Sequence, residues 1–274
     1  MSHQIPRVNV LGVGISAINL RSAGDAIHEA VAERRKGYVC VTGVHGVSEA
    51  QQDPAFKDIL NQSFLTTPDG MPMVWCGWKE GRKEMDRVYG PDLMLQVLEE
   101  GVTRKVRHFL YGGRDGVAGT LKAKLEAKFP GVIITGCYTP PFRDLTSEEF
   151  SSLQERIRSE RPDIVWVGLG CPKQERLMPK FLPLLDTTLM FGVGAAFDFH
   201  SGTVPQAPHW MQRSGMEWFF RLTKEPRRLW KRYLVYNPLF IARILLQWTG
   251  LREYPLPATD KLVLSTNPPP SPDL

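Results

Sequence analysis

The first 200 residues alternate short apolar runs with longer segments in which apolar residues recur every three or four positions. The short runs are rich in β-branched and aromatic residues and carry no charge, a pattern typical of strands buried on both faces. They predict strands at Val8–Val13, Tyr38–Thr42, Ser63–Thr67, Phe109–Tyr111, Val132–Gly136, Ile164–Gly168 and Met190–Val193. The segments between them predict helices near residues 22–36, 45–61, 91–101, 115–129, 147–160 and 173–184. This alternation predicts an α/β fold with a mainly parallel, Rossmann-like sheet and helices on both faces.

The pattern changes after residue 204. Helical segments rich in aromatic and basic residues replace the strands, and Pro226 and Pro238 are expected to start or kink helices. The run Pro238–Trp248 is strongly apolar, but it is too short to span a bilayer. Its pattern fits a helix lying in a membrane interface and equally a helix packed on the core.

This change divides the chain into three parts. Residues 1–204 are expected to form a Rossmann-like core, residues 205–254 a helical, basic and aromatic appendage, and residues 255–274 a proline-rich, disordered tail. With 274 residues, the chain is long enough for one large α/β domain with an appendage. The four cysteines lack the spacing of a zinc site or a disulfide framework, and Met1–Asn9 is too short and polar for a secretory signal peptide. These features favour the cytosol.

The basic charge of the chain is local. The net charge is +5, yet residues 1–204 hold equal numbers of basic and acidic side chains. Residues 205–254 hold nine basic and three acidic side chains, interleaved with Trp, Phe and Tyr. A solvated helix face is the simpler interpretation of a charge run, but the aromatic residues favour a phosphate-rich or anionic partner.

Two glycine-containing turns in the first 70 residues carry candidate chemistry. The motif from Gly12 to Ala17 matches G-x-G-x-x-A, but the next predicted strand ends without the acid that would hold a ribose, so a dinucleotide site is disfavoured. The turn Thr66–Gly70 places Asp69 at the carboxyl end of a strand. There Asp69 fits either a site acid or a turn residue that bonds nearby backbone.

Three further turns follow later strands. Tyr111–Gly116 suits backbone N–H donation to a phosphate or nucleotide at a helix N-terminus, with an ordinary tight turn as the alternative. Gly168–Glu175 and Gly192–Asp198 are two more such turns, each of which alone fits a structural role. Because all of these turns lie at strand ends, they predict together one long cleft across an edge of the sheet.

Several motifs occur in an order that resembles one protein family. They are VTGVHGVSEAQQDP, TPDGMP, GPDLML, YGGRDGVA, GLGCPKQE, GVGAAFDFHSG and EWFFRLTKEPRRLWKRY, spread over residues 7–248. This set resembles the WecG/TagA/CpsF glycosyltransferases, glycosyltransferase family 26. The resemblance implies a Rossmann-like core and a C-terminal appendage that helps close the site at the membrane. It also implies transfer of an N-acetylmannosamine-type or related sugar from a UDP donor to a polyprenyl-diphosphate-linked sugar, in bacterial surface or exopolysaccharide synthesis. The resemblance further implies that no metal is needed. It implies no cofactor either, because the UDP-sugar is a substrate.

The resemblance also implies roles for individual residues. Asp69 matches the general base that takes a proton from the acceptor hydroxyl, Thr42 a donor-site threonine, and Gln174 a polar residue facing the reacting sugar. The substrate-binding residues expected beside them are His45, Gly112, Gly113, Gly168, Gly170, Pro172, Lys173, Glu175, Asp198, Arg221, Arg227, Arg228 and Arg232. The four arginines fall where the family binds diphosphate, and guanidinium groups can supply the countercharge in charge-assisted bonds.

One position departs from the family pattern. Many members carry an Asn in a T-x-N motif, whereas Thr42 is followed here by Gly43, Val44 and His45. Either His45 takes over part of the role of the Asn, or the site prefers a different sugar. A histidine that caps a helix or packs in the core is the simpler alternative, so the donor sugar stays open.

The expected partners are a UDP-sugar donor, a polyprenyl-diphosphate-linked glycan acceptor and an anionic membrane surface. The protein is therefore expected in the cytoplasm, peripheral on the inner face of the cell membrane. A nucleic-acid partner is not expected, because the basic block contains no known motif and residues 234–248 are too apolar for a simple phosphate grip. A regulatory protein that binds a UDP-sugar without transferring it is the alternative function. The oligomeric state is open, with a homo-oligomer among the outcomes.

Overall fold

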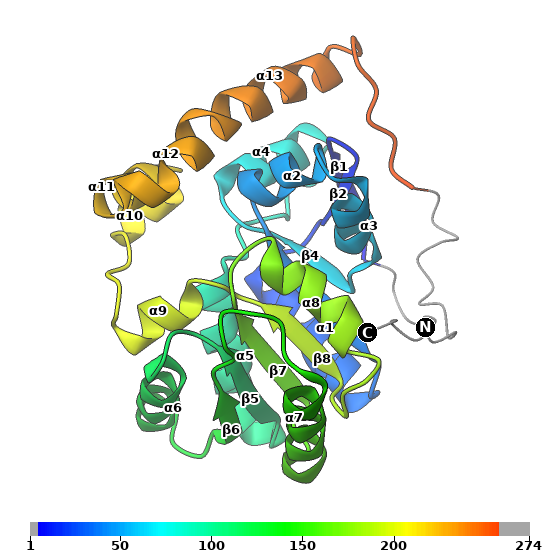
Figure 1. Ribbon diagram of the computed structural model, residues 1–274. Coiled ribbons are helices and arrows are strands. Elements are labelled where there is room, and N and C mark those ends of the chain that lie inside the picture. The colour runs from blue at the N-terminus through cyan, green and yellow to red at the C-terminus, as the bar shows by residue number, and fades with distance from the viewer. Residues whose placement is uncertain (1–4, 258–274) are drawn as a thin grey trace.

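The computed structural model describes residues 5–257, except for the side chains of His209, Arg213, Arg228 and Arg232. Most of the predicted disordered tail, residues 258–274, therefore lies outside the described residues. A central sheet organises the fold (Figure 1). In spatial order its strands are β4 (Leu65–Pro68), β3 (Gly37–Thr42), β8 (Leu189–Gly192), β7 (Ile164–Gly168), β5 (Arg107–Gly112) and β6 (Ile133–Tyr138). Each neighbouring pair is parallel, which confirms the predicted α/β class and brings all the carboxyl ends to one edge.

The predicted first strand, Val8–Val13, is wrong. The segment instead forms an antiparallel hairpin of β1 (Arg7–Val10) and β2 (Val13–Ser16), separate from the main sheet. Leu11 and Gly12 make the two-residue turn with φ of 54° and 79°, as hairpin turns that match the strand twist require. The G-x-G-x-x-A motif thus lies in a hairpin and lacks the strand-to-helix context of a dinucleotide site.

Helices cover both faces of the sheet, as predicted. The hydrophobic cluster on one face involves α1 (Leu20–Ala32), α5 (Gly90–Arg104), α6 (Val117–Lys128) and α9 (Ala196–Ser201). The cluster on the other face involves the hairpin, α2 (Val44–Ala50), α3 (Pro54–Gln62), α4 (Met71–Lys79), α7 (Ser147–Glu160) and α8 (Lys173–Phe181). Along β7, Val165 and Val167 join one cluster while Ile164 and Trp166 join the other. This alternation is the period-two pattern of a strand buried on both faces.

Two helical predictions need correction. The single helix predicted near 45–61 is broken into α2 and α3, because Asp53 caps a new helix. Its side chain accepts a hydrogen bond from Phe56 N at 3.1 Å, and Pro54 occupies the first turn. Helix α4, directly after the Asp69 turn, was not predicted.

The C-terminal appendage is helical, as predicted. It consists of α10 (His209–Arg213), α11 (Glu217–Lys224), α12 (Pro226–Leu234) and α13 (Tyr236–Trp248). In Figure 1 the appendage passes along α4 and α2. Helix α13 buries Phe240 and Ile244 in the core, and Gln247 bonds Leu11 N and Asn9 O of the hairpin, both at 2.8 Å. Core packing of this helix is thus confirmed. Among the described helices, none has the length and apolar character needed to cross a membrane.

Candidate active site

Thr42 and Asp69 lie together at the carboxyl ends of β3 and β4. The Asp69 N–H donates to the Thr42 carbonyl oxygen at 3.1 Å, which joins the two strand ends. Gly43 packs so closely on this turn that a Cβ there would lie 2.6 Å from the Asp69 carbonyl oxygen and 3.7 Å from its Oδ2. Gly70 has a φ of 92°, which a side chain would strain, and leads the chain directly into α4. The fold therefore brings both predicted residues to one point.

The segment before α5 lies beside the Asp69 turn. Val88 N donates to Pro68 O at 2.9 Å, and Thr67 Oγ1 donates to Val88 O at 3.3 Å. These bonds fix Arg87 and Tyr89 next to the Asp69 turn. Neither residue belongs to the motif turns at strand ends, so the sequence analysis did not select them. Burial, and then the charge of Glu217, raise the pKa of Tyr89 well above its ordinary value.

The appendage contacts this segment through α11. Glu217 accepts a hydrogen bond from the Tyr89 hydroxyl at 2.8 Å and pairs with the Arg87 guanidinium. Arg221, one helical turn later, lies 5.7 Å from the centre of the Phe199 ring. Burial alone would lower the pKa of Arg221, but it is raised by its neighbours Tyr233, Tyr89, Glu217 and Asp69. Arg221 thus lies on the part of α11 that faces Tyr89 and Phe199 of the core.

The glycines after β5 and β7 have a packing reason. Gly113 N donates to Gly168 O at 3.0 Å, and a Cβ on Gly112 would lie 2.7 Å from the same oxygen. A Cβ on Gly168 would lie 2.6 Å from the Phe197 ring. The strand ends therefore approach too closely for side chains, whatever ligand binds above them.

The turn after β7 packs against the end of β8, where a Cβ on Gly192 would lie 2.8 Å from Gln174 Nε2, and near Gly46, which also packs against Thr42. Gln174 Oε1 accepts from Gly170 N at 3.0 Å, and its Nε2 donates to Glu175 Oε1 at 2.9 Å. Gln174 is 3% exposed and Glu175 1%, so both lie behind the turn. Lys173 is exposed, whereas Pro172 follows Cys171 through a cis peptide bond at the start of α8.

The remaining predicted residues are spread around this edge. His45 points toward the appendage: its ring stacks on Tyr236 at 5.6 Å and 17°, and its Nδ1 lies 3.8 Å from Glu49 Oε1. Asp198 is partly buried in α9. Arg227 is exposed on α12, and the side chains of Arg228 and Arg232 lie outside the described part of the chain.

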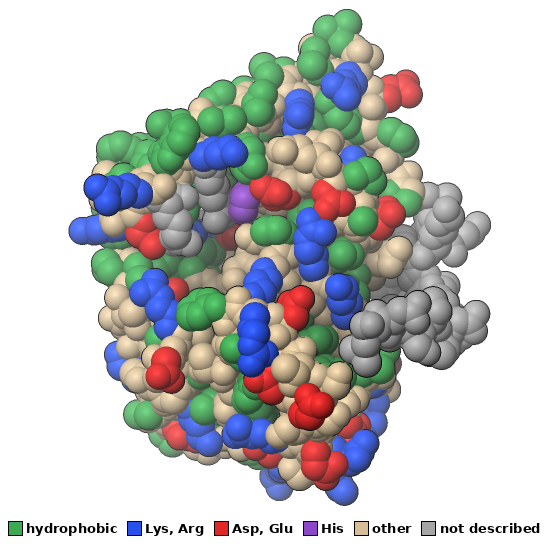
Figure 2. Space-filling view, viewed as in Figure 1, with side chains coloured by type: hydrophobic (Ala, Val, Ile, Leu, Met, Phe, Trp, Pro, Cys, Tyr) green, Lys and Arg blue, Asp and Glu red, His purple; other side chains and the backbone are tan. Residues whose placement is uncertain are grey.

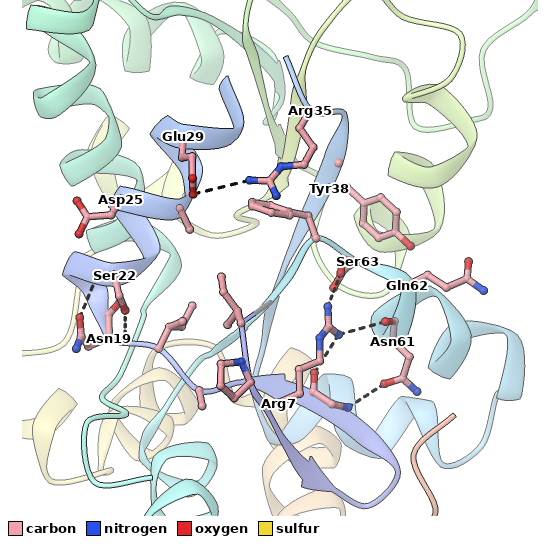
Figure 3. A pocket seen from close by; sticks show the side chains of 18 of the residues that line it. Arg7, Asn19, Ser22, Asp25, Glu29, Arg35, Tyr38, Asn61, Gln62 and Ser63 are labelled. Atoms are coloured by element: carbon pink, nitrogen blue, oxygen red, sulfur yellow. Dashed lines mark hydrogen bonds and ion pairs between the residues drawn. The ribbon is translucent and has the colours of Figure 1, made fainter. Parts of the chain in front are cut away.

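A cavity of about 1200 Å³ lies elsewhere, near the amino end of β3 (Figure 3). Arg7 reaches into it, but its guanidinium is already bonded to Gly14 O, Asn61 O, Thr66 Oγ1 and Ser63 O. Burial lowers the pKa of Arg7 from its ordinary value. This arginine fastens the hairpin to α3 and β4, so we do not assign it to a ligand. In the described residues, no cluster of His, Cys, Asp and Glu is arranged to hold a metal ion.

Comparison with known proteins agrees with the motifs. The model of the glycosyl transferase WecG/TagA/CpsF family matches residues 8–254. An N-acetylglucosaminyldiphosphoundecaprenol N-acetyl-beta-D-mannosaminyltransferase of Bacillus subtilis (strain 168) is 30% identical over 233 residues, which cover 85% of this chain and 86% of that protein. A protein of the same name from Bacillus spizizenii is 30% identical over 214 residues, covering 78% and 80% of the two chains. The matches include the core and the helical appendage.

Proposed function

The chain belongs to the WecG/TagA/CpsF family of glycosyl transferases, and from this premise we propose that it moves a sugar from a UDP donor to a polyprenyl-diphosphate-linked sugar. One observation carries the proposal. The turn that carries a carboxylate, Asp69, is bonded through Pro68 and Val88 to the segment of Tyr89, and Tyr89 bonds Glu217 of α11, one helical turn before the Arg221 guanidinium. The carboxylate suits proton removal, and the guanidinium suits a departing diphosphate.

In the proposed reaction, the acceptor hydroxyl attacks the anomeric carbon of the donor sugar. Asp69 takes the hydroxyl proton as the new carbon–oxygen bond forms. The bond to the UDP oxygen breaks, and its electron pair leaves with UDP. Arg221 then stabilises the negative charge that develops on the diphosphate, and we assign the neighbouring Arg227, Arg228 and Arg232 to the same diphosphate-binding role. No step of this proposal uses a metal ion.

We place the donor along the strand ends between Thr42 and the glycine turns. Thr42 is buried beside the Asp69 turn, and its hydroxyl lies at the end of β3. Lys173 and the backbone of Gly112, Gly113, Gly168 and Pro172 supply further contacts in this proposal, with Asp198 near the far end. The geometry favours Gln174 and Glu175 as residues that hold the Gly170 turn in place, since both side chains lie behind it. His45 contacts the appendage, so a role in donor selectivity would act through that contact.

The outer face of the appendage supports a membrane-surface partner. Figure 2 shows green hydrophobic side chains along this part of the molecule, with blue basic ones among them. The exposed apolar residues are Trp210, Met216, Phe219, Trp230, Leu234, Leu239, Ile241, Leu245, Leu246, Trp248 and Leu251. Lys224, Arg227 and Lys231 are exposed on the same segment. Apolar side chains flanked by cations suit the interface of an anionic membrane, where a polyprenyl-linked acceptor would lie. We therefore propose a peripheral position on the inner face of the cell membrane.

A transfer assay tests the proposed function. Purified protein is mixed with a panel of UDP-sugars and a short-chain polyprenyl-diphosphate-sugar acceptor, in the presence of EDTA. We expect UDP release that requires both substrates, survives EDTA and disappears in Asp69→Asn. Asp186→Asn is the matched control, because Asp186 is an exposed acid just before β8, at the edge of the sheet opposite the proposed site. Binding of a UDP-sugar without turnover on any acceptor would favour the regulatory alternative.

A further inference from the structure

Helix α11 contacts the core without a fully buried side chain. Every residue of α11 is described; Trp218, Phe220 and Leu222 are half-buried, and none is fully buried. Helix α13 differs, because it buries Phe240 and Ile244 in the core. The directional contacts of α11 with the core are those of Glu217, which bonds the Tyr89 hydroxyl and pairs with Arg87, and of Arg221, which lies over the Phe199 ring.

The partner of Glu217 is itself fixed. Arg87 donates a hydrogen bond to Gln212 Oε1 at 3.0 Å, and its guanidinium lies 4.0 Å from the centre of the Tyr89 ring. Gln212 in turn donates to Ala207 O at 2.8 Å. The side chains of Arg87 and Glu217 are only 10% and 16% exposed, so water is largely excluded from their contact. The pair therefore sets one geometry for α11 rather than a loose surface attraction.

This contact connects the two halves of the proposed site. Val88, between Arg87 and Tyr89, is bonded to Pro68, the residue before Asp69. On the other side, Glu217 and Arg221 are four residues apart and share one face of α11. A continuous path of contacts thus runs from the Asp69 turn through Val88, Tyr89 and Glu217 to the helical turn that carries Arg221.

We propose that Glu217 is a positioning residue that docks α11 on the core and thereby holds Arg221 over the reacting groups. Glu217 touches neither substrate in this scheme. The inference rests on the proposed function, and it identifies the side chain that assembles that site from two separate parts of the chain. Losing the carboxylate charge leaves Arg87 without its acidic partner and weakens the docking of α11.

A double-mutant cycle separates positioning from general support of the fold. The variants are Glu217→Gln, which keeps the side-chain shape, Arg221→Gln, and the combination of both. Thr223→Ala is the control on the same helix, because Thr223 is exposed and its hydroxyl donates to Phe220 O of its own helix. Each full-length variant is assayed for kcat and for donor KM. Hydrogen exchange is measured on a peptide spanning residues 214–225.

We expect Glu217→Gln to lower kcat by about tenfold or more, in line with the cost of misplacing a charged group. Exchange of the 214–225 peptide rises by about fivefold or more as α11 opens locally, while Thr223→Ala matches the wild type in both measurements. If Glu217 acts through Arg221, the double variant is as slow as Arg221→Gln alone, within about twofold. The inference would be overturned if the fold-losses in kcat of the two single variants multiplied in the double variant. Unchanged kcat in Glu217→Gln would overturn it as well.

The exchange measurement keeps the inference testable without turnover. If the wild type transfers no sugar from any donor, the proposed function fails, but the docking role is still decided. Faster exchange of the 214–225 peptide in Glu217→Gln, but not in Thr223→Ala, supports Glu217 as the group that holds α11. Unchanged exchange in this variant overturns it.

Discussion

Replacing Gly43 by alanine is expected to displace the Asp69 turn, even though alanine can adopt the φ and ψ of Gly43. Gly43 has φ −112° and ψ −163°, an extended conformation that any residue adopts. The added methyl group is therefore harmful only through what it meets. Its nearest neighbour would be the Asp69 carbonyl oxygen at 2.6 Å, a backbone atom that cannot rotate away.

The size of the effect follows from this contact. The distance must grow from 2.6 Å to at least 3.0 Å before the Cβ is tolerated, and to 3.4 Å for an ordinary contact. The Asp69 turn, the Gly43 segment or both must therefore move by about 0.4–0.8 Å in total. A misplacement of about 1 Å can cost about a hundredfold in rate, so we expect kcat to fall by about tenfold.

The assay compares kcat, donor KM and melting temperature for Gly43→Ala and Gly119→Ala. A Cβ on Gly119, in α6, meets no atom within 4 Å, so this control should keep its kcat and gain up to about 1 kcal/mol in stability. A Gly43→Ala protein that is folded and transfers sugar at the wild-type rate would refute the placement of Asp69 as the base.

Three further predictions concern folding and membrane binding. Burial lowers the pKa of His108 from 6.5 to about 3, so its contribution to stability is lost as pH falls below 6.5; between pH 7.5 and 5.5 the loss is about 1.4 kcal/mol. Urea unfolding should show a loss that is smaller by about this amount in His108→Asn, whose amide oxygen can still accept from Trp166; the lowered pKa values of His28 and His200 contribute equally to both proteins. Arg7→Lys should lower the free energy of unfolding by about 3 kcal/mol in the same assay, because an ammonium cannot reproduce the guanidinium fork; an unchanged midpoint would contradict its role. The double variant Trp230→Glu, Leu234→Glu should cosediment less with anionic vesicles. Its melting temperature should stay unchanged, because the two side chains are 52% and 57% exposed.

The sheet could be predicted from the sequence because its strands, apart from the half-buried edge strand β6, are mostly buried on both faces. Six uncharged runs rich in β-branched or aromatic residues correspond to the six parallel strands, with boundaries shifted by only a few residues. The run at Val8–Val13 looked the same, yet it forms a hairpin. Its turn at Leu11 and Gly12 is hidden inside an apolar stretch, so periodicity gives no sign of it.

The site was predictable only in part. Asp69 and Thr42 lie at strand ends, and a parallel sheet necessarily brings such positions to one edge. Arg87 and Tyr89 lie outside the quoted motifs, and Glu217 begins the motif EWFFRLTKEPRRLWKRY without a role assigned to it. The contacts of these three residues join segments far apart in the chain, which no local spacing reveals. The glycine turns show a different limit. The turn Tyr111–Gly116 predicts a phosphate cradle, and close backbone approach at Gly112 and Gly168 is a second reason for glycine at the same strand ends. The sequence alone does not separate these two reasons.

The way the appendage is attached bears on how substrates could enter. Helix α13 is anchored by apolar burial, which is stabilising in proportion to area, whereas α11 depends on a buried ion pair. Such a pair contributes little net stability, because the cost of desolvating two charges offsets most of their attraction. It still fixes the geometry of docking, since a docked position that buries either charge without its partner is costly. Full opening is different, because both charges then return to water. A contact of this kind fixes the orientation of α11 but adds little to its stability. Helix α11 is therefore expected to move away from the core at small free-energy cost while α13 stays anchored, and to return to the same position. In the proposed reaction, a UDP-sugar could then enter from one side and a lipid-linked acceptor from the other, before Arg221 again faces Asp69.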